Sequence, residues 1–193
     1  FNLGSFLIEH KQPDEGVPLV RQASAWLDAN RPDGDAKALV ARSVLAYGLE
    51  DQGDLDGAER LLRALLQTQE RLGGPGAPDT FAPRNNLAML LMKRGRLDEA
   101  LREFEVLDAQ VSARLGADHP FAAIFASNRG ECLGKLGRFE EARHVLEESL
   151  ARLQAKFGST HERTLKAAKN LEFVYRNLSM DAELLSLKVD YRI

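Results

Sequence analysis

Apolar side chains recur at helical spacing along the whole chain, and glycine or proline interrupts them at regular intervals. The stretch 83–93 shows the pattern, because Leu87, Ala88 and Leu91 fall on one face of a helix. Gly95 follows and can end that helix in the left-handed conformation. No stretch alternates apolar and polar residues as a half-buried strand does. The sequence therefore predicts an all-α fold.

A second helix is predicted over 97–115. Its apolar residues Leu101, Phe104 and Leu107 share one side, and Gly116 stops it. The two helices together form a hairpin, with Gly95 in the turn between them.

This hairpin pattern repeats every 42 residues. Gly-Arg-Leu-Asp-Glu-Ala at 95–100 matches Gly-Arg-Phe-Glu-Glu-Ala at 137–142, an offset of 137 − 95 = 42. The same step places a partial copy at 1–34, full copies at 35–76, 77–118 and 119–160, and a degenerate copy or cap at 161–193. A single hairpin cannot bury its apolar face, so we expect one array over 1–193 in which antiparallel hairpins stack into a right-handed superhelix, or solenoid.

Small residues stand twelve positions apart in each copy, one on each helix, where they let the two backbones approach closely. Enlarging one of them should overpack the contact and destabilise it by roughly 1–3 kcal/mol. The pairs are Gly4 with Gly16, Ala46 with Ala58, Ala88 with Ala100, and Gly130 with Ala142.

Helix starts are predicted where the copies join. Asp118 is expected to cap the helix that begins near Pro120, and Ser-Thr-His-Glu at 159–162 reads as a capping box. His119 and His161 share one repeated position, which also suggests a metal site. They lack companion cysteines or paired acids at ligand spacing, so we expect a role in capping and loop packing.

A small residue followed twelve positions later by Ala, with Leu just before the first and an aromatic residue or Leu four after the second, resembles the tetratricopeptide repeat (TPR). Leu87-Ala88 with Ala100 and Phe104 carries this resemblance. The standard unit has about 34 residues, and the longer unit is similar to the repeats of kinesin light chains and of many bacterial arrays. The resemblance implies a concave groove, lined by the first helices of successive hairpins, that holds an extended or helical peptide.

Three departures from the repeat concern the later copies. Arg129 stands where other copies have Leu, Glu172 replaces the small residue of the last copy, and Leu184 replaces its Ala. These changes predict that the final hairpin is a more polar end cap.

An asparagine column is the main candidate for peptide binding, because each amide offers two donors and an acceptor to a peptide backbone. The resemblance implies that Asn86, Asn128 and Asn170 contact the peptide; the alternative is that they satisfy neighbouring helices. Lys93 and Lys135, with Lys169 and Arg176, could form a basic stripe for an acidic peptide, although cations also favour helix C-termini without any ligand. The full candidate set is Asn85, Asn86, Met89, Lys93, Asn128, Lys135, Asn170, Phe173 and Asn177.

Composition narrows the function classes. The formal net charge of −3 gives no basic footprint for nucleic acid. The longest apolar run, 87–92, is too short to span a membrane, and no signal peptide is evident.

The single cysteine, Cys132, is expected to be a structural thiol in a cytoplasmic protein. Trp26 is expected to pack in the core. A start at Phe1 rather than Met suggests a piece of something longer.

The sequence thus favours a non-catalytic scaffold for a protein or peptide partner, with no cofactor and no metal. Two alternatives remain open at this point. One is a ligand- or peptide-responsive regulatory domain of a larger bacterial signalling protein, such as a kinase or a transcription regulator. The other is self-association, as a homodimer through the end repeats.

Overall fold

Helices account for the regular structure throughout the computed structural model, which describes residues 1–116 and 118–193. These residues form ten α-helices and one short 3-10 helix, and they contain no strand. None of the described helices combines the length and the apolar character needed to cross a membrane. The all-α fold class predicted from the repeat pattern is confirmed. By its internal contacts the chain divides into two units, residues 1–94 and 95–193.

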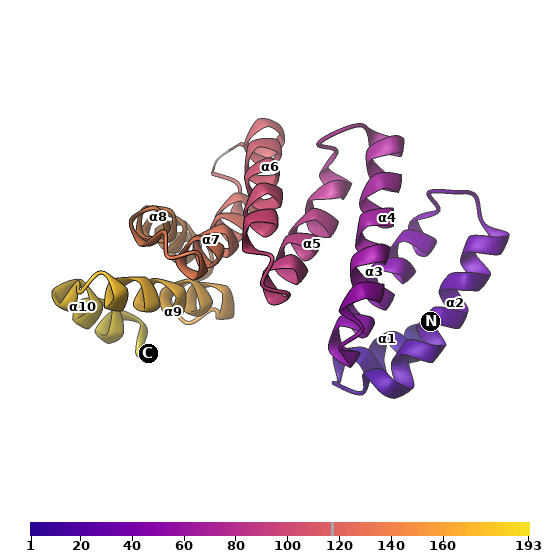
Figure 1. Cartoon of the computed structure of the whole chain (residues 1–193), viewed down its shortest axis with the longest axis horizontal. Coiled ribbons are helices and arrows are strands. Elements are labelled where there is room, and N and C mark those ends of the chain that lie inside the picture. Colours follow the sequence, from indigo (N-terminus) through magenta and orange to yellow (C-terminus); the bar gives the residue numbers. More distant parts are fainter. Residues whose placement is uncertain (117) are drawn as a thin grey trace. The chain divides into compact units, whose positions relative to one another are not determined.

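The first unit is a series of antiparallel neighbours in chain order (Figure 1). Helix α1 packs on α2, α2 on α3, α3 on α4, and α4 on α5. Its core includes Ile8, Val20 and Leu65, all nearly without solvent exposure. The elements are α1 (Asn2–Glu9), α2 (Pro13–Asn30), α3 (Ala36–Gln52), α4 (Leu55–Gly73), η1 (Pro78–Thr80) and α5 (Phe81–Lys93).

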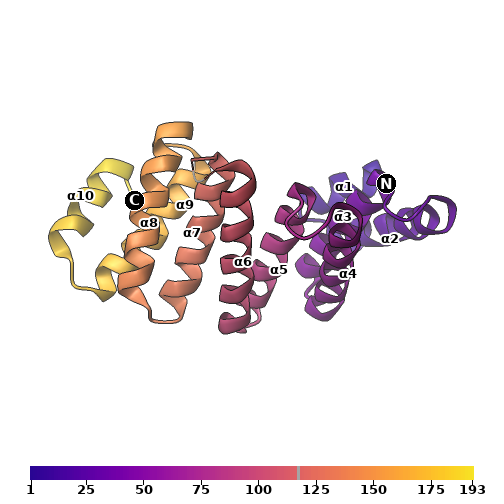
Figure 2. The same ribbon diagram turned by 90° about the horizontal axis from the view of Figure 1, so that it is seen from above.

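The second unit continues with the same kind of packing. Helix α7 contacts α6, α8 and α9, and α10 packs on α9 (Figure 2). Phe104, Leu107, Leu146 and Leu153 form its buried centre. The elements are α6 (Leu97–Leu115), α7 (Pro120–Lys135), α8 (Phe139–Phe157), α9 (Glu162–Asn177) and α10 (Asp181–Tyr191).

Of the close approaches predicted for the small residues, that of Gly4 and Gly16 is confirmed, and Gly130 approaches Leu146 of α8 where Ala142 was expected. A Cβ atom added to Gly16 of α2 would lie 2.6 Å from the carbonyl oxygen of Gly4 in α1. A Cβ atom added to Gly130 of α7 would lie 2.6 Å from Cγ of Leu146 in α8. Both distances are shorter than carbon atoms tolerate, so glycine is what allows these helix pairs to pack.

Histidine, and not the residues expected, caps the first helix of the later hairpins. The Phe121 N–H donates to Nδ1 of His119 at 3.2 Å, and the Arg163 N–H donates to Nδ1 of His161 at 3.2 Å. The expectation of Asp118 as cap and of a capping box at 159–162 was wrong, because the residue directly before the helix places Nδ1 within reach of a free N–H. The capping role predicted for the two histidines is confirmed.

Two single residues test the expected core. Cys132 is fully buried, and its Sγ donates to the carbonyl of Leu97 at 3.4 Å. Burial raises the pKa of this thiol to about 11, so it is a structural thiol as predicted. Trp26 is not a core residue: it is 57% exposed on α2, and the expectation that it packs inside was wrong. One repeat later, the position of Trp26 is held by Thr68 of α4, which is half-buried.

Candidate functional site

Helices α7 and α9 are the first helices of two successive hairpins, and they lie against each other in the second unit (Figure 2). Several predicted binding residues share the surface that these two helices form. We call this surface the α7/α9 face; it consists of Asn128, Glu131, Lys135, Lys166, Asn170 and Phe173.

A lysine joins the two helices across this face. Lys166 Nζ of α9 donates to Oδ1 of Asn128 in α7 at 3.2 Å. The same ammonium lies 3.2 Å from Oε2 of Glu131. The other oxygen of this carboxylate, Oε1, lies 3.2 Å from Nζ of Lys135. Asn128 is only 8% exposed, so its amide is largely shielded from solvent where it accepts from Lys166. One acceptor of the asparagine column therefore has a structural partner.

Asn170 contributes a different kind of group. Its amide nitrogen is buried and donates to no acceptor among the residues that the structure describes. A buried donor without a partner destabilises a protein by about 1–3 kcal/mol, so such a group calls for an explanation.

Phe173 gives the face its apolar part. Its side chain is 50% exposed, and its ring meets the ring of Phe139 edge-on at a centroid distance of 6.1 Å. Gly134 of α7 leaves room beside it, since a Cβ there would lie 3.7 Å from the Phe173 ring. Asn177 is already engaged on its own helix, where Nδ2 donates to the Phe173 carbonyl at 2.8 Å.

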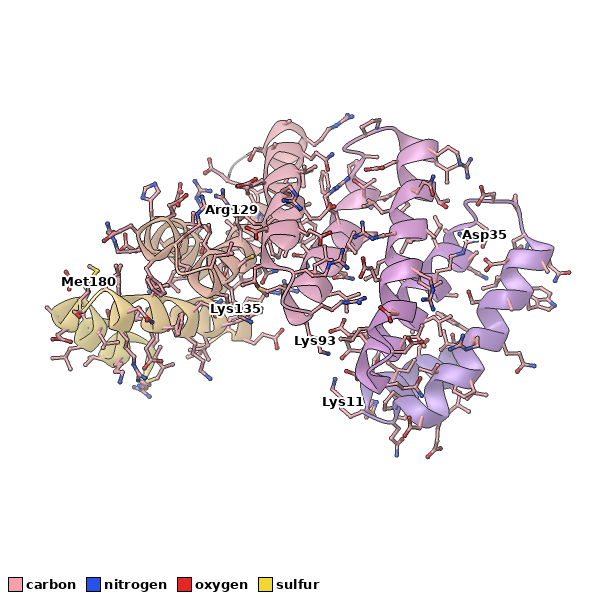
Figure 3. All side chains as sticks on the ribbon, in the orientation of Figure 1. Lys11, Asp35, Lys93, Arg129, Lys135 and Met180 are labelled. Atoms are coloured by element: carbon pink, nitrogen blue, oxygen red, sulfur yellow. The ribbon has the colours of Figure 1, made fainter. Side chains whose placement is uncertain are left out.

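The first unit carries the other predicted residues on α5. Asn86 is exposed and Asn85 half-buried, with 3.5 Å between Asn85 Nδ2 and Asn86 Oδ1. Met89 is half-buried. Lys93 pairs with Glu50 of α3 at 3.1 Å. Lys93 and Lys135, near the C-terminal ends of α5 and α7, are labelled in Figure 3.

Lys93, Lys135 and Arg176 of the predicted basic stripe therefore each face a carboxylate within their own unit. A further lysine on the first unit behaves in the same way. Lys11 Nζ donates to Tyr47 Oη at 2.8 Å and to Asp51 at 3.0 Å (Figure 3). These two hydrogen bonds raise the pKa of the Lys11 ammonium. An acidic ligand would have to compete with these carboxylates.

Outside residue 117, no three His, Cys, Asp or Glu side chains gather where they could hold a metal ion.

Comparison with known proteins places the chain in a family. The tetratricopeptide repeat model matches residues 36–107, 79–155 and 121–182, which together span most of the chain. The chain belongs to the tetratricopeptide repeat family. No curated protein sequence matches it.

Solved structures show the same TPR fold at low sequence identity. A kinesin light chain-like protein of Podosopora anserina, built from nearly identical TPR-like repeats, is 22% identical with a TM-score of 0.82, over 99% of this chain and 90% of that one. BtubC (BKLC) from P. vanneervenii is 17% identical with a TM-score of 0.83, over 98% and 76%. The apo form of RapI is 15% identical with a TM-score of 0.84, over 100% and 67%.

The sequence did not single out Lys166, although the TPR pattern contains a signal for it. Lys166 follows Asn128 by 38 residues, one 42-residue repeat less one helical turn of four. A residue at that offset lies on the next first helix, one turn towards its N-terminus, and can reach the asparagine of the preceding copy.

Proposed function

We propose that this TPR chain is a non-catalytic scaffold that binds a peptide segment of a partner protein on the first-helix surfaces of its hairpins. The α7/α9 face is the main site in the second unit. The observation that carries the proposal is Lys166, which contacts both Asn128 and Glu131 from the neighbouring helix. Lys166 brings an amide and charges of both signs together on one face, and the exposed Phe173 ring lies on the same helix, α9.

We infer the chemistry of the peptide from the groups on this face. A carboxylate of the peptide would compete with Glu131 for Lys166, and charge-assisted hydrogen bonds of this kind are short and strong. The unpartnered Asn170 nitrogen supplies a donor for a backbone carbonyl once a small side-chain rotation exposes it. Phe173 offers apolar contact. We therefore expect a segment with an acidic residue close to an apolar one.

Exposed positions test this proposal without disturbing the core. The variants are Phe173→Asp and Lys166→Glu on the face, with Val106→Asp on α6 as the matched control, because Val106 is also well exposed. Proteins captured from the native lysate are quantified by mass spectrometry, and the captured partner is then divided into synthetic peptides. We expect both face variants to weaken binding of one peptide at least tenfold. Equal binding by all variants would remove the α7/α9 face as the site.

A peptide-responsive regulatory domain in a larger bacterial signalling protein is the second candidate. The observation in its favour is a fold likeness to a Rap protein complexed with Competence and Sporulation Factor, at 12% identity and a TM-score of 0.77. Small-angle scattering with and without the peptide identified above separates the two functions. A regulatory domain should change its dimensions on binding, and a scaffold should not.

The single buried thiol of Cys132 also fits a reducing compartment. We accordingly include a cytoplasmic location in the proposal. Fusion of the chain to a fluorescent protein in the source cell tests it by microscopy.

A further inference from the structure

A small polar cavity lies in the second unit between α6, α7 and α8, with a volume of about 200 Å³. Drug-sized ligands occupy pockets of about 300–1,000 Å³, so this cavity has room for one smaller molecule. All of its lining residues lie outside the α7/α9 face. Its wall carries four charged side chains and two hydroxyls, which belong to Asp108, Ser112, Arg129, Glu148, Ser149 and Arg152.

Three of these polar residues stand at positions where the repeat has leucine. One repeat away, each corresponds to a leucine whose side chain is buried, and for two of them this holds on both sides. The cavity therefore occupies a place that the other copies fill with apolar core. The corresponding leucines are Leu66 and Leu150 for Asp108, Leu87 and Leu171 for Arg129, and Leu107 for Ser149.

The gain in stability from an ion pair does not account for this exchange. Arg129 Nη2 lies 3.0 Å from Asp108 Oδ2, and the two side chains are 27% and 28% exposed. Well-packed apolar residues are often as stabilising as such a partly buried pair, or more so, because both charges lose hydration. Moreover, Nε of Arg129 (Figure 3) is buried and has no hydrogen-bond partner among residues 1–116 and 118–193. Arg129 thus keeps an unused donor beside the cavity.

We propose that the cavity binds a small zwitterion, a free α-amino acid, whose carboxylate pairs with Arg129 and whose ammonium pairs with Asp108. Two arginines and two acids line the wall, so its charges compensate each other. An anion alone at Arg129 would be repelled by Asp108, and a cation alone at Asp108 would be repelled by Arg129. A ligand with both charges satisfies both side chains through charge-assisted hydrogen bonds.

Ser149 adds an acceptor for the ammonium group. Its side chain is 1% exposed, and its hydroxyl donates to the Leu146 carbonyl of its own helix at 3.1 Å. Because the hydroxyl proton is used in this bond, the oxygen is left to accept a hydrogen bond from the ligand.

This site is separate from the peptide site, and either proposal can fail alone. The cavity selects a small molecule by two opposite charges, whereas the α7/α9 face selects a segment of a protein. Phe173→Asp, which tests the α7/α9 face, should therefore leave amino-acid binding unchanged.

The experiment is calorimetric titration of the whole chain with each of the twenty common L-amino acids. Acetate and methylamine, which carry one charge each, are titrated at the same ionic strength. The test variant is Asp108→Leu with Arg129→Leu, which restores the leucines of the adjacent copies and should fold, as thermal unfolding checks. Arg102→Leu is the matched control, because Arg102 is an exposed arginine of α6 that does not line the cavity.

We expect saturable binding of at least one amino acid by the wild type and by Arg102→Leu. The double leucine variant should bind that amino acid at least tenfold more weakly, and the wild type should bind acetate and methylamine at least tenfold more weakly than the amino acid. Saturable binding of none of the twenty, or equal binding by the double variant, would overturn the proposal. Acetate bound as tightly as the amino acid would also overturn it, in favour of a site for anions alone.

Discussion

Glu172 of α9 and Lys188 of α10 form an ion pair at 3.4 Å, at the positions that Gly130 and Leu146 hold one repeat earlier. In α7 and α8 this place is a close contact between a glycine and a buried leucine. In the last hairpin it is a charged pair, which Arg176 extends with a 2.6 Å contact to Glu172. A polar contact of this kind is what the predicted end cap would carry.

Restoring the apolar contact should stabilise the last hairpin. Glu172→Ala with Lys188→Leu exchanges a partly exposed ion pair, worth at most about 1 kcal/mol, for buried aliphatic surface worth about 1–2 kcal/mol. We expect the free energy of unfolding to rise by about 1 kcal/mol in urea denaturation. The two single variants complete the cycle and measure the coupling of the pair. A double variant less stable than the wild type would contradict this account of the end cap.

Two glycines of α7 should respond to alanine in opposite directions. Gly130→Ala places a Cβ 2.6 Å from Leu146, so overpacking of about 1–3 kcal/mol exceeds the gain of about 1 kcal/mol in helix propensity. Gly134→Ala meets its nearest neighbour at 3.6 Å and should stabilise the protein by about 0.5–1 kcal/mol. Thermal unfolding of the two variants side by side provides the measurement. Similar shifts in Tm would argue against glycine-dependent packing of α7 on α8.

The histidine cap of α9 should contribute measurably to stability. His161→Ala removes the acceptor for the Arg163 N–H and should lower the free energy of unfolding by about 1 kcal/mol. His161→Asp supplies a carboxylate acceptor at the same place and should restore most of the loss. If Ala and Asp at this position gave equal stability, packing of the ring on Phe157 would be the main contribution of His161.

Stability should fall at alkaline pH because of Cys132. Its pKa is raised to about 11 in the folded chain, so the unfolded chain releases the thiol proton first as the pH rises. The contribution is intact below the ordinary thiol pKa of 9.0 and is lost towards pH 11, by about 2–3 kcal/mol in all. Cys132→Ala should show a shallower decline than the wild type in urea titrations from pH 8 to 10.5. Parallel declines would mean that the thiol titrates normally.

The repeat made the helices and their pairing predictable, because a 42-residue period with helical apolar spacing leaves few other folds. Gly4, Gly16 and Gly130 were identified from spacing alone, since only a small side chain permits the approach that they make. These features depend on neighbours along one hairpin, which the sequence displays directly.

What escaped prediction depends on neighbours that the sequence does not display. Lys166 has its role because it contacts Asn128 and Glu131, which belong to the adjacent hairpin. Trp26 sits at a position that is apolar in pattern, yet it is 57% exposed on α2. The capping role of the two histidines was predicted. The sequence did not show that Nδ1 of the residue at 119 and at 161 would be the acceptor, because this depends on the backbone geometry there.

The most direct test of the central claim compares partner binding by the wild type and by the Asn86/Asn128/Asn170→Ala triple variant. Each is used to capture proteins from the native lysate, with thermal unfolding as the check on folding. The account predicts a partner that the wild type and Val106→Asp retain and the triple variant loses, with little change in Tm. Identical captured proteins, or a loss of binding that follows a large fall in Tm, would show that the asparagine column is structural.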